Sequence, residues 1–313
     1  MVQTTQIAKG WQHFNDCPLC GSSNHGILYD KAKDRHYQIQ GEFTIEKCNE
    51  CSLVFLNPMP DDSILTTFYP EDFYAYQEFT EQPNQIKQFL KKFLVPGVGT
   101  NDPKFDKPGK MLDLGCGSGQ FLSKMREQGW ETYGVEVSTD AATLGKNSAG
   151  LNIFAGSLLE ANFPSDHFDY VRSNHSFEHV YNPNETMAEI KRILKPGGKL
   201  MIGVPNINSL NANSYKQYWW YLGAPVHTYN YSVKSLTRMM EKYDLTVENI
   251  GYNSHYMGIL GSLQIYLNRN TTKASTEGSA IANPILIVLS QYFSKIVDLF
   301  KAGDAIEITC TKK

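Results

Sequence analysis

The stretch Met111-Leu112-Asp113-Leu114-Gly115-Cys116-Gly117-Ser118-Gly119 is a short apolar segment that runs into three closely spaced glycines. Apolar residues then recur at helical spacing between positions 121 and 125. We predict a strand, a glycine loop and a helix, an arrangement that brings backbone amides close to a ligand at the start of a helix. A dinucleotide-binding loop of the G-x-G-x-x-G type would need glycine at position 120, where this chain has Gln120.

A second predicted strand, 132–137, carries an acid near its end, Glu136. A carboxylate at that point of an open α/β sheet can accept hydrogen bonds from both hydroxyls of a ribose. The alternative is an acid at a solvated strand end. The glycine loop and Glu136 together predict an α/β fold that binds a nucleoside-containing cofactor.

The D-x-G-x-G-x-G pattern that starts at Asp113, with the acid of the next strand, resembles the class I S-adenosylmethionine-dependent methyltransferases. Residues 154–158, 167–171 and 189–200 are similar to that family's third, fourth and fifth strand regions, so the resemblance covers about residues 109–252. It implies a Rossmann-like sheet and an enzyme that uses S-adenosylmethionine. The residues that it assigns to the cofactor are Asp113, Gly115, Cys116, Gly117, Gly119, Glu136, Ser157, Leu158 and Asn174.

One position departs from the family pattern. The family usually has an acid just after the third-strand glycine, where it receives the adenine amino group, and this chain has Ser157 after Gly156. The Ser157 hydroxyl can still accept a hydrogen bond, and the backbone of Leu158 is a second candidate for contact with adenine.

Four cysteines form two identical spacings, Cys17-x-x-Cys20 and Cys48-x-x-Cys51. Two such knuckles complete a tetrahedral, all-cysteine site, so we predict a structural Zn²⁺. Two disulfides or four unrelated thiols are the alternatives, and disulfides do not suit a chain without a secretion signal. A site closed by four protein ligands stabilises the fold and has no open position for catalysis.

Beyond the fourth predicted strand, a loop carries His175, Glu178 and His179. Ligands in open α/β sheets bind beyond the carboxyl ends of the strands, and a neutral imidazole is the natural base near pH 7. The Glu178-His179 pair resembles an acid–histidine step that small-molecule methyltransferases associate with proton removal. We predict a base here, His179 ahead of His175, the alternative being a histidine that caps a helix or packs under the cofactor.

An aromatic insertion, 206–228, follows the fifth predicted strand and suits stacking on a sugar ring or a base. A hydrophobic lid or a dimer contact is the alternative. His227 near its end is a second candidate for the catalytic site, because it resembles a histidine at the same point of related enzymes.

Length and prolines divide the chain as follows. We predict a zinc ribbon over 1–60, a helical connector and linker over 61–108, and a methyltransferase domain over 109–313. That domain carries the insertion 206–228 and a second one, 254–302.

The second insertion contains an amphipathic helix, 283–301, whose apolar face we expect to pack on the protein's own core or on a second subunit, as in a homodimer. Peripheral contact with a membrane is the alternative, but the polar face has few lysines and arginines.

The net charge of −3 lacks the basic excess of a nucleic-acid-binding protein. No apolar run is long enough to span a bilayer and no secretory signal opens the chain, so we expect a cytoplasmic protein. The zinc knuckles resemble those of bacterial methyltransferases of sugar and surface-polysaccharide biosynthesis. We therefore predict a saccharide substrate, with an RNA methyltransferase that grips RNA through the knuckles as the alternative. A scaffold that has lost its chemistry is disfavoured by the intact glycines and Glu136.

Overall fold

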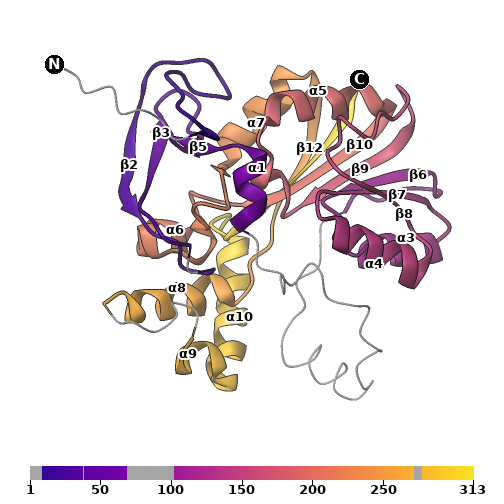
Figure 1. The fold of residues 1–313 in the computed structure, drawn as a ribbon. Helices are drawn as coiled ribbons and strands as arrows, with labels where there is room; N and C mark the ends of the chain where they lie inside the picture. The colour runs from indigo at the N-terminus through magenta and orange to yellow at the C-terminus, as the bar shows by residue number, and fades with distance from the viewer. Residues whose placement is uncertain (1–8, 38, 69–101, 271–276) are drawn as a thin grey trace.

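A computed structural model describes residues 9–37, 39–68, 102–270 and 277–313. The predicted connector falls largely outside these ranges. In Figure 1 a small antiparallel sheet from the N-terminal part lies beside a larger sheet, and three helices near the C-terminus extend away from both. Among the described residues, no helix is long and apolar enough to cross a bilayer.

The larger sheet has seven strands in the order β12-β13-β10-β9-β6-β7-β8. Neighbouring strands from β8 through β7, β6 and β9 to β10 pair in parallel. The strand β13 pairs antiparallel with both β10 and β12. This mixed sheet confirms the Rossmann-like methyltransferase fold predicted from the sequence. The strands are β6 (Lys110–Leu114), β7 (Glu131–Glu136), β8 (Asn152–Ala155), β9 (Phe168–Asn174), β10 (Leu194–Pro205), β12 (Leu245–Tyr252) and β13 (Ala305–Lys312).

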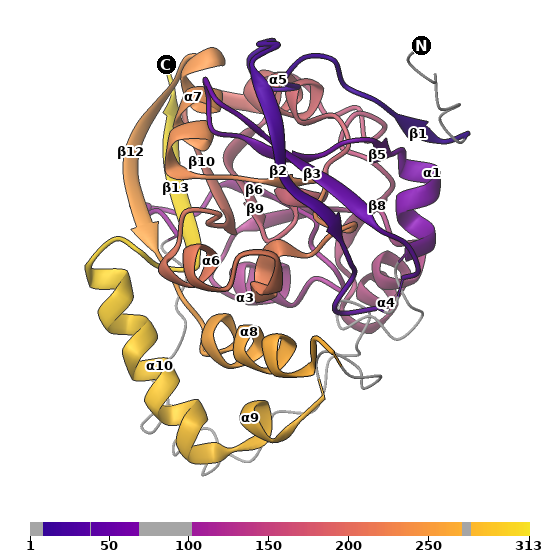
Figure 2. The same cartoon turned by 90° about the vertical axis from the view of Figure 1, so that its left-hand side faces the viewer.

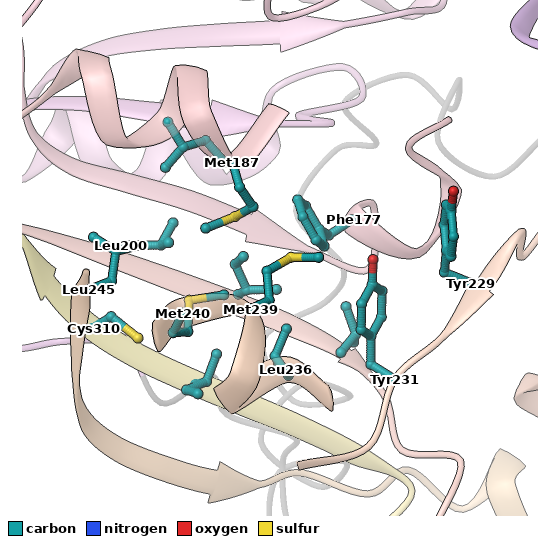
Figure 3. Packing of buried hydrophobic residues seen from close by; sticks show 14 of the residues in the cluster. Phe177, Met187, Leu200, Tyr229, Tyr231, Leu236, Met239, Met240, Leu245 and Cys310 are labelled. Atoms are coloured by element: carbon teal, nitrogen blue, oxygen red, sulfur yellow. The ribbon is translucent and has the colours of Figure 1, made fainter. Parts of the chain in front are cut away.

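Helices cover both faces of this sheet (Figure 1). On one face, α3 (Gln120–Glu127) and α4 (Thr139–Ala149) bury Leu122 and Ala142 in a cluster with Met111 of β6. On the other face lie α5 (Pro183–Ile193) and α7 (Val233–Lys242). Figure 3 shows Met187 of α5 and Met239 and Met240 of α7 converging in one buried cluster. Apolar stripes on these helices thus hold the sheet edge that carries the candidate site.

The N-terminal part forms the small sheet β11-β4-β3-β2. Three of its strands come from the N-terminal segment: β2 (His25–Ala32), β3 (Phe43–Cys48) and β4 (Val54–Leu56). The fourth, β11 (Tyr229–Asn230), follows the aromatic insertion, and it pairs antiparallel with β4. Two short strands, β1 (Trp11–Gln12) and β5 (Met59–Pro60), pair next to this sheet, and α1 (Asp62–Leu65) and η1 (Thr66–Phe68) follow. The N-terminal segment and the chain just after the aromatic insertion therefore share a sheet.

The insertions carry the remaining helices. The aromatic insertion forms α6 (Leu210–Tyr215), η4 (Lys216–Tyr218) and η5 (Trp220–Leu222), and η3 (Phe177–His179) lies in the histidine loop. The second insertion forms α8 (Met257–Asn268), α9 (Ser279–Ala282) and α10 (Pro284–Leu299). Figure 2 shows these last three arranged at one end of the molecule.

The orientation of α10 corrects one expectation. Its apolar side chains do not pack on the protein's own core: eight of them, on the helix and just after it, are between 37% and 82% exposed. The buried face is polar instead, because Gln291 accepts a hydrogen bond from the Tyr256 amide and Asp298 accepts two from Ser254. The exposed residues are Ile285, Leu286, Leu289, Tyr292, Phe293, Ile296, Leu299 and Phe300.

Candidate functional site

The glycine loop connects β6 to α3 through three residues with positive φ, Gly115 at 72°, Gly117 at 55° and Gly119 at 84°. Only glycine adopts this region without strain. A Cβ at Gly115 would lie 2.3 Å from the Cβ of Ser176, whose hydroxyl donates to the Leu114 carbonyl at 2.7 Å. The glycine loop therefore lies directly against the histidine loop after β9.

Glu136, at the end of β7, is buried and already fixes the backbone around it. Its Oε2 accepts from the Gly117 amide at 2.8 Å, and its Oε1 accepts from the Ser138 amide at 2.9 Å. A carboxylate has about four acceptor positions, so each oxygen keeps one for a further donor. The geometry leaves Glu136 able to accept from two ribose hydroxyls next to the glycine loop.

Asp113 has a partner that the sequence did not reveal. Its Oδ1 accepts from the Arg172 guanidinium at 3.0 Å, and Arg172 also contacts Asp102 at 3.1 Å and stacks over the Phe121 ring. Burial raises the pKa of Asp113 to about 6, against the lowering effect of Arg172. This pair, 59 positions apart, ties β6 to β9 beneath the glycine loop. Arg172 directly follows the predicted strand region 167–171, and no local pattern indicated its pairing with Asp113.

Cys116 lies in the loop as a packing residue. Burial raises the pKa of its thiol well above the usual value, so the thiol stays protonated. A Cβ at Gly134 of β7 would come within 2.6 Å of its sulfur, which explains the glycine in that strand.

After β8, the carboxylate of Glu160 lies against Ser157, the position where the family usually has an acid. Glu160 Oε2 accepts from the Ser157 amide at 2.7 Å and from its hydroxyl at 2.8 Å. Leu158 is buried in the core, which leaves only its backbone for a ligand. Val137, directly after Glu136, is 64% exposed and offers an apolar surface. Sequence reasoning missed Glu160 because the family pattern puts the acid three positions earlier.

The histidine loop begins where β9 ends. Asn174 has a side-chain oxygen that is buried with no hydrogen-bond partner among the described residues. His175 follows with φ 53°, a backbone region that is uncommon for residues other than glycine. Its side chain is 40% exposed, its Nδ1 lies 3.6 Å from Glu178 Oε1, and its ring stacks on Tyr221 with centroids 6.5 Å apart.

Glu178, His179 and His227 form a compact cluster next to His175. One potential ligand atom from each lies within 4.8 Å of the others, and the two imidazole centroids are 4.7 Å apart. His179 Nδ1 contacts the Val226 carbonyl at 3.0 Å, and His227 Nδ1 contacts the Tyr221 carbonyl at 2.9 Å. The structure thus brings together the three candidates of the histidine loop and His227 of the aromatic insertion, although His227 is 48 positions beyond His179.

The charges in this cluster follow from its burial. Burial would raise the pKa of Glu178, but contact with His175 and the nearby His179 lowers it to about 2. Burial, with His179 beside it, lowers the pKa of His227 to about 3. At neutral pH the cluster therefore has an ionised carboxylate facing a neutral His227 ring.

The aromatic insertion is partly structural. Trp219 is 1% exposed and donates from Nε1 to Asp304 at 2.9 Å, and Asp304 also accepts from Ser209 and Asn211. Trp219 and Leu222 pack against apolar residues of the ribbon. Trp219 is therefore not available for stacking on a substrate. Tyr221 is half-buried beside His175, whereas the half-buried Trp220 lies against the His36 ring, with centroids 4.5 Å apart.

The four knuckle cysteines converge as the sequence predicts. The Cys17 and Cys51 sulfurs are 3.5 Å apart, those of Cys20 and Cys48 are 3.6 Å apart, and all four lie within 4.8 Å of one another. Four thiolates at about 2.3 Å from one tetrahedral zinc would be roughly 3.8 Å apart. The Cys51 amide also donates to the Cys48 sulfur at 3.5 Å. The residues present fit Zn²⁺.

Comparison with known proteins agrees with this fold. A family described as a methyltransferase domain matches residues 76–250, which is more than half of the chain. The chain is 33% identical over 105 residues to a ribosomal RNA small subunit methyltransferase C of Alcanivorax borkumensis, covering 31% of this chain and 32% of that protein. It is 29% identical over 171 residues to a demethylmenaquinone methyltransferase of Bacillus cereus, covering 44% and 71%.

Among solved structures, one similar chain is an S-adenosylmethionine-dependent methyltransferase from Archaeoglobus fulgidus. The match has a TM-score of 0.49 and 20% identity, and it covers 78% of this chain and 100% of that chain. Two further, uncharacterized relatives are matched over 66% and 32% of their length. The chain therefore spans less than two thirds of several of the curated relatives that it matches.

Proposed function

We propose that this chain, which belongs to the methyltransferase domain family and is an S-adenosylmethionine-dependent methyltransferase, methylates a small molecule. The proposed substrate is a sugar or nucleotide sugar of surface-polysaccharide biosynthesis. The observation that supports this most is the pairing of an exposed histidine, His175, with the Tyr221 ring beside the glycine loop. Aromatic faces next to a base suit a sugar ring. The net charge of −3 disfavours the RNA alternative.

In this proposal the cofactor occupies the loop between β6 and α3. Glu136 accepts from the ribose hydroxyls, and the amides of the glycine loop face the amino-acid part of the cofactor. Val137 would offer its exposed side chain to the adenine, and the Glu160 carboxylate, to which Ser157 donates two hydrogen bonds, would accept from the adenine amino group. Asn174 would offer its buried side-chain oxygen, which has no partner among the described residues. Asp113 supports the glycine loop from beneath through the hydrogen bond that it accepts from Arg172.

The chemistry is a displacement at the methyl carbon. We propose His175 as the base, ahead of His179, because its ring is the more exposed and lies beside the Glu178 carboxylate. His175 takes the proton of the acceptor group, the acceptor atom bonds to the methyl carbon, and the carbon–sulfur bond breaks with its electron pair staying on sulfur. The sulfonium is already a good leaving group, so alignment supplies much of the rate.

Replacing the base should separate chemistry from cofactor binding. In His175→Ala we expect kcat to fall about 100-fold or more, the range for loss of a general base, with the Kd for S-adenosylmethionine unchanged. Single-turnover assays with labelled cofactor measure the first quantity and calorimetry the second. A variant with wild-type kcat would remove His175 from the reaction.

The substrate class needs its own test. Incubation of the protein with labelled S-adenosylmethionine and a cell extract of sugar nucleotides should transfer label to a saccharide, which mass analysis of the product identifies. Ribosomal RNA from the same cells is the parallel sample. Label in RNA and none in the sugar fraction would favour the RNA alternative over the saccharide.

We further propose a structural Zn²⁺ at Cys17, Cys20, Cys48 and Cys51. When bound, this ion closes the two knuckles into one unit. The knuckles lie in the main core, where three of the four cysteines pack with residues of β6, α5 and α7. The boundaries 1–60, 61–108 and 109–313 remain proposals about the chain's organisation.

The exposed apolar face of α10 is the proposed contact of a homodimer. Ile285, Leu289, Tyr292, Ile296 and Leu299 follow the alternating four- and three-residue spacing of a coiled-coil seam. Exposed apolar side chains at this spacing suit a helix–helix interface. The helix has few lysines and arginines, which disfavours binding to anionic lipid.

Sedimentation should detect this dimer. We expect the wild type to be a dimer and Leu289→Glu a monomer, because a carboxylate in the seam loses its hydration on association. Ile27→Glu, at an exposed apolar position on β2, is the control and should stay dimeric. A wild type that is monomeric but floats with lipid vesicles would replace the dimer by a membrane contact.

A further inference from the structure

The cluster of Glu178, His179 and His227 has a property that proton transfer does not explain. Glu178 is 1% exposed, and its Oε2 has no hydrogen-bond partner among the described residues. Its other oxygen faces His175 at 3.6 Å. A buried carboxyl oxygen is costly unless a hydrogen-bonding group or a cation faces it. A group that the described residues do not supply is therefore expected at Oε2.

The two imidazoles are arranged as metal ligands usually are. Each Nδ1 is held by a backbone carbonyl, Val226 for His179 and Tyr221 for His227. Such a contact places the ring proton on Nδ1, orients the ring, and makes Nε2 the nitrogen with a lone pair. Gly223 is part of this support: it has φ 57°, and a Cβ there would come within 2.5 Å of the His227 ring.

The spacing of the donors suits a single ion. The three potential ligand atoms lie within 4.8 Å of one another. Metal–ligand bonds of about 2.0–2.2 Å to imidazole nitrogen and carboxylate oxygen put neighbouring ligands roughly 3–4 Å apart, a change that small side-chain rotations provide. The cluster unites two residues of η3 with one near the end of the aromatic insertion, so the folded chain assembles it.

We propose that Glu178, His179 and His227 bind a divalent transition-metal ion on the acceptor side of the proposed methyl-transfer site. Two imidazoles and one carboxylate are the donor set that Zn²⁺, Co²⁺ and Fe²⁺ accept, and three protein ligands leave at least one position open. This inference deepens the proposed function, since a metal at that position would bind an acceptor oxygen and lower its pKa. It selects acceptors with a hydroxyl, such as a sugar, and assigns His175 to the proton that this hydroxyl releases.

Metal content tests the site without any assay of methyl transfer. The full-length protein is equilibrated with Co²⁺ or Zn²⁺, dialysed, and analysed for metal per chain by plasma mass spectrometry. We expect two ions in the wild type, one at the cysteines and one at the histidines. His227→Ala and Glu178→Gln should each bind one. His175→Ala, which removes a neighbour that is not a ligand, should keep two.

Calorimetry with S-adenosylmethionine shows that each variant is folded and that the proposed cofactor site is intact. One ion in the wild type at saturating metal would overturn the inference, as would two ions in both His227→Ala and Glu178→Gln. Either result, with cofactor binding preserved, leaves the proposed methyl transfer standing. Loss of cofactor binding in the wild type would instead count against the proposed function.

Discussion

Glu136→Ala should weaken the binding of S-adenosylmethionine at least about 100-fold. In the proposed site two charge-assisted hydrogen bonds from the ribose are lost, each worth roughly 1.5–3 kcal/mol. The carboxylate also holds the Gly117 and Ser138 amides, so the glycine loop loses support from the same change. Calorimetric titration of the purified variant measures the Kd.

Glu136→Gln separates these two contributions. The glutamine has the same shape and keeps one acceptor oxygen, so it should support part of the loop while binding ribose poorly; we expect an intermediate Kd. Glu131→Ala, at an exposed acid at the start of the same strand, is the matched control. A wild-type Kd in Glu136→Ala would show that the ribose lies elsewhere.

Cys48→Ser should remove one equivalent of zinc and destabilise the whole protein. Zinc bound by cysteine knuckles contributes roughly 10–16 kcal/mol of apparent free energy, comparable to the stability of an entire domain. Because β4 of the ribbon pairs with β11, and the knuckle cysteines pack in the main core, the loss should spread beyond the ribbon. Zinc analysis and thermal unfolding measure the two effects.

Cys116→Ala provides the comparison, since Cys116 is outside the knuckles and half-buried. It should keep the wild-type zinc content, whereas strong chelation of the wild type should reproduce the Cys48→Ser unfolding curve. A Cys48→Ser protein with undiminished zinc and an unchanged melting temperature would contradict the zinc proposal.

Local patterns predicted the sheet well. Glycines with a following helical pattern located β6 and α3, and an apolar run that ends in an acid located β7. The resemblance to the methyltransferase family located β9 and β10. Each of these signals lies within a few residues of the element that it predicts.

Contacts between distant residues set what the sequence left open. The amphipathic pattern of α10 identifies its apolar face but not the direction of that face, which depends on Asp298 meeting Ser254 and Gln291 meeting the Tyr256 amide. Likewise, the sequence pattern predicts a stacking role for Trp219. In the structure its indole nitrogen donates a hydrogen bond to Asp304, 85 positions away.

The candidate site shows the same division. A single loop brings together His175, Glu178 and His179, because they are close in the sequence. The approach of His227 depends on the aromatic insertion packing against the ribbon, a tertiary contact with no local signal. Glu160 became visible only through its hydrogen bonds with Ser157.

Calorimetric titration of the wild-type chain with S-adenosylmethionine tests the central claim most directly. We expect saturable binding of one cofactor per chain in the micromolar range, abolished or strongly weakened in Glu136→Ala. The absence of binding at millimolar cofactor, in a protein shown to be folded by its unfolding transition, would contradict it.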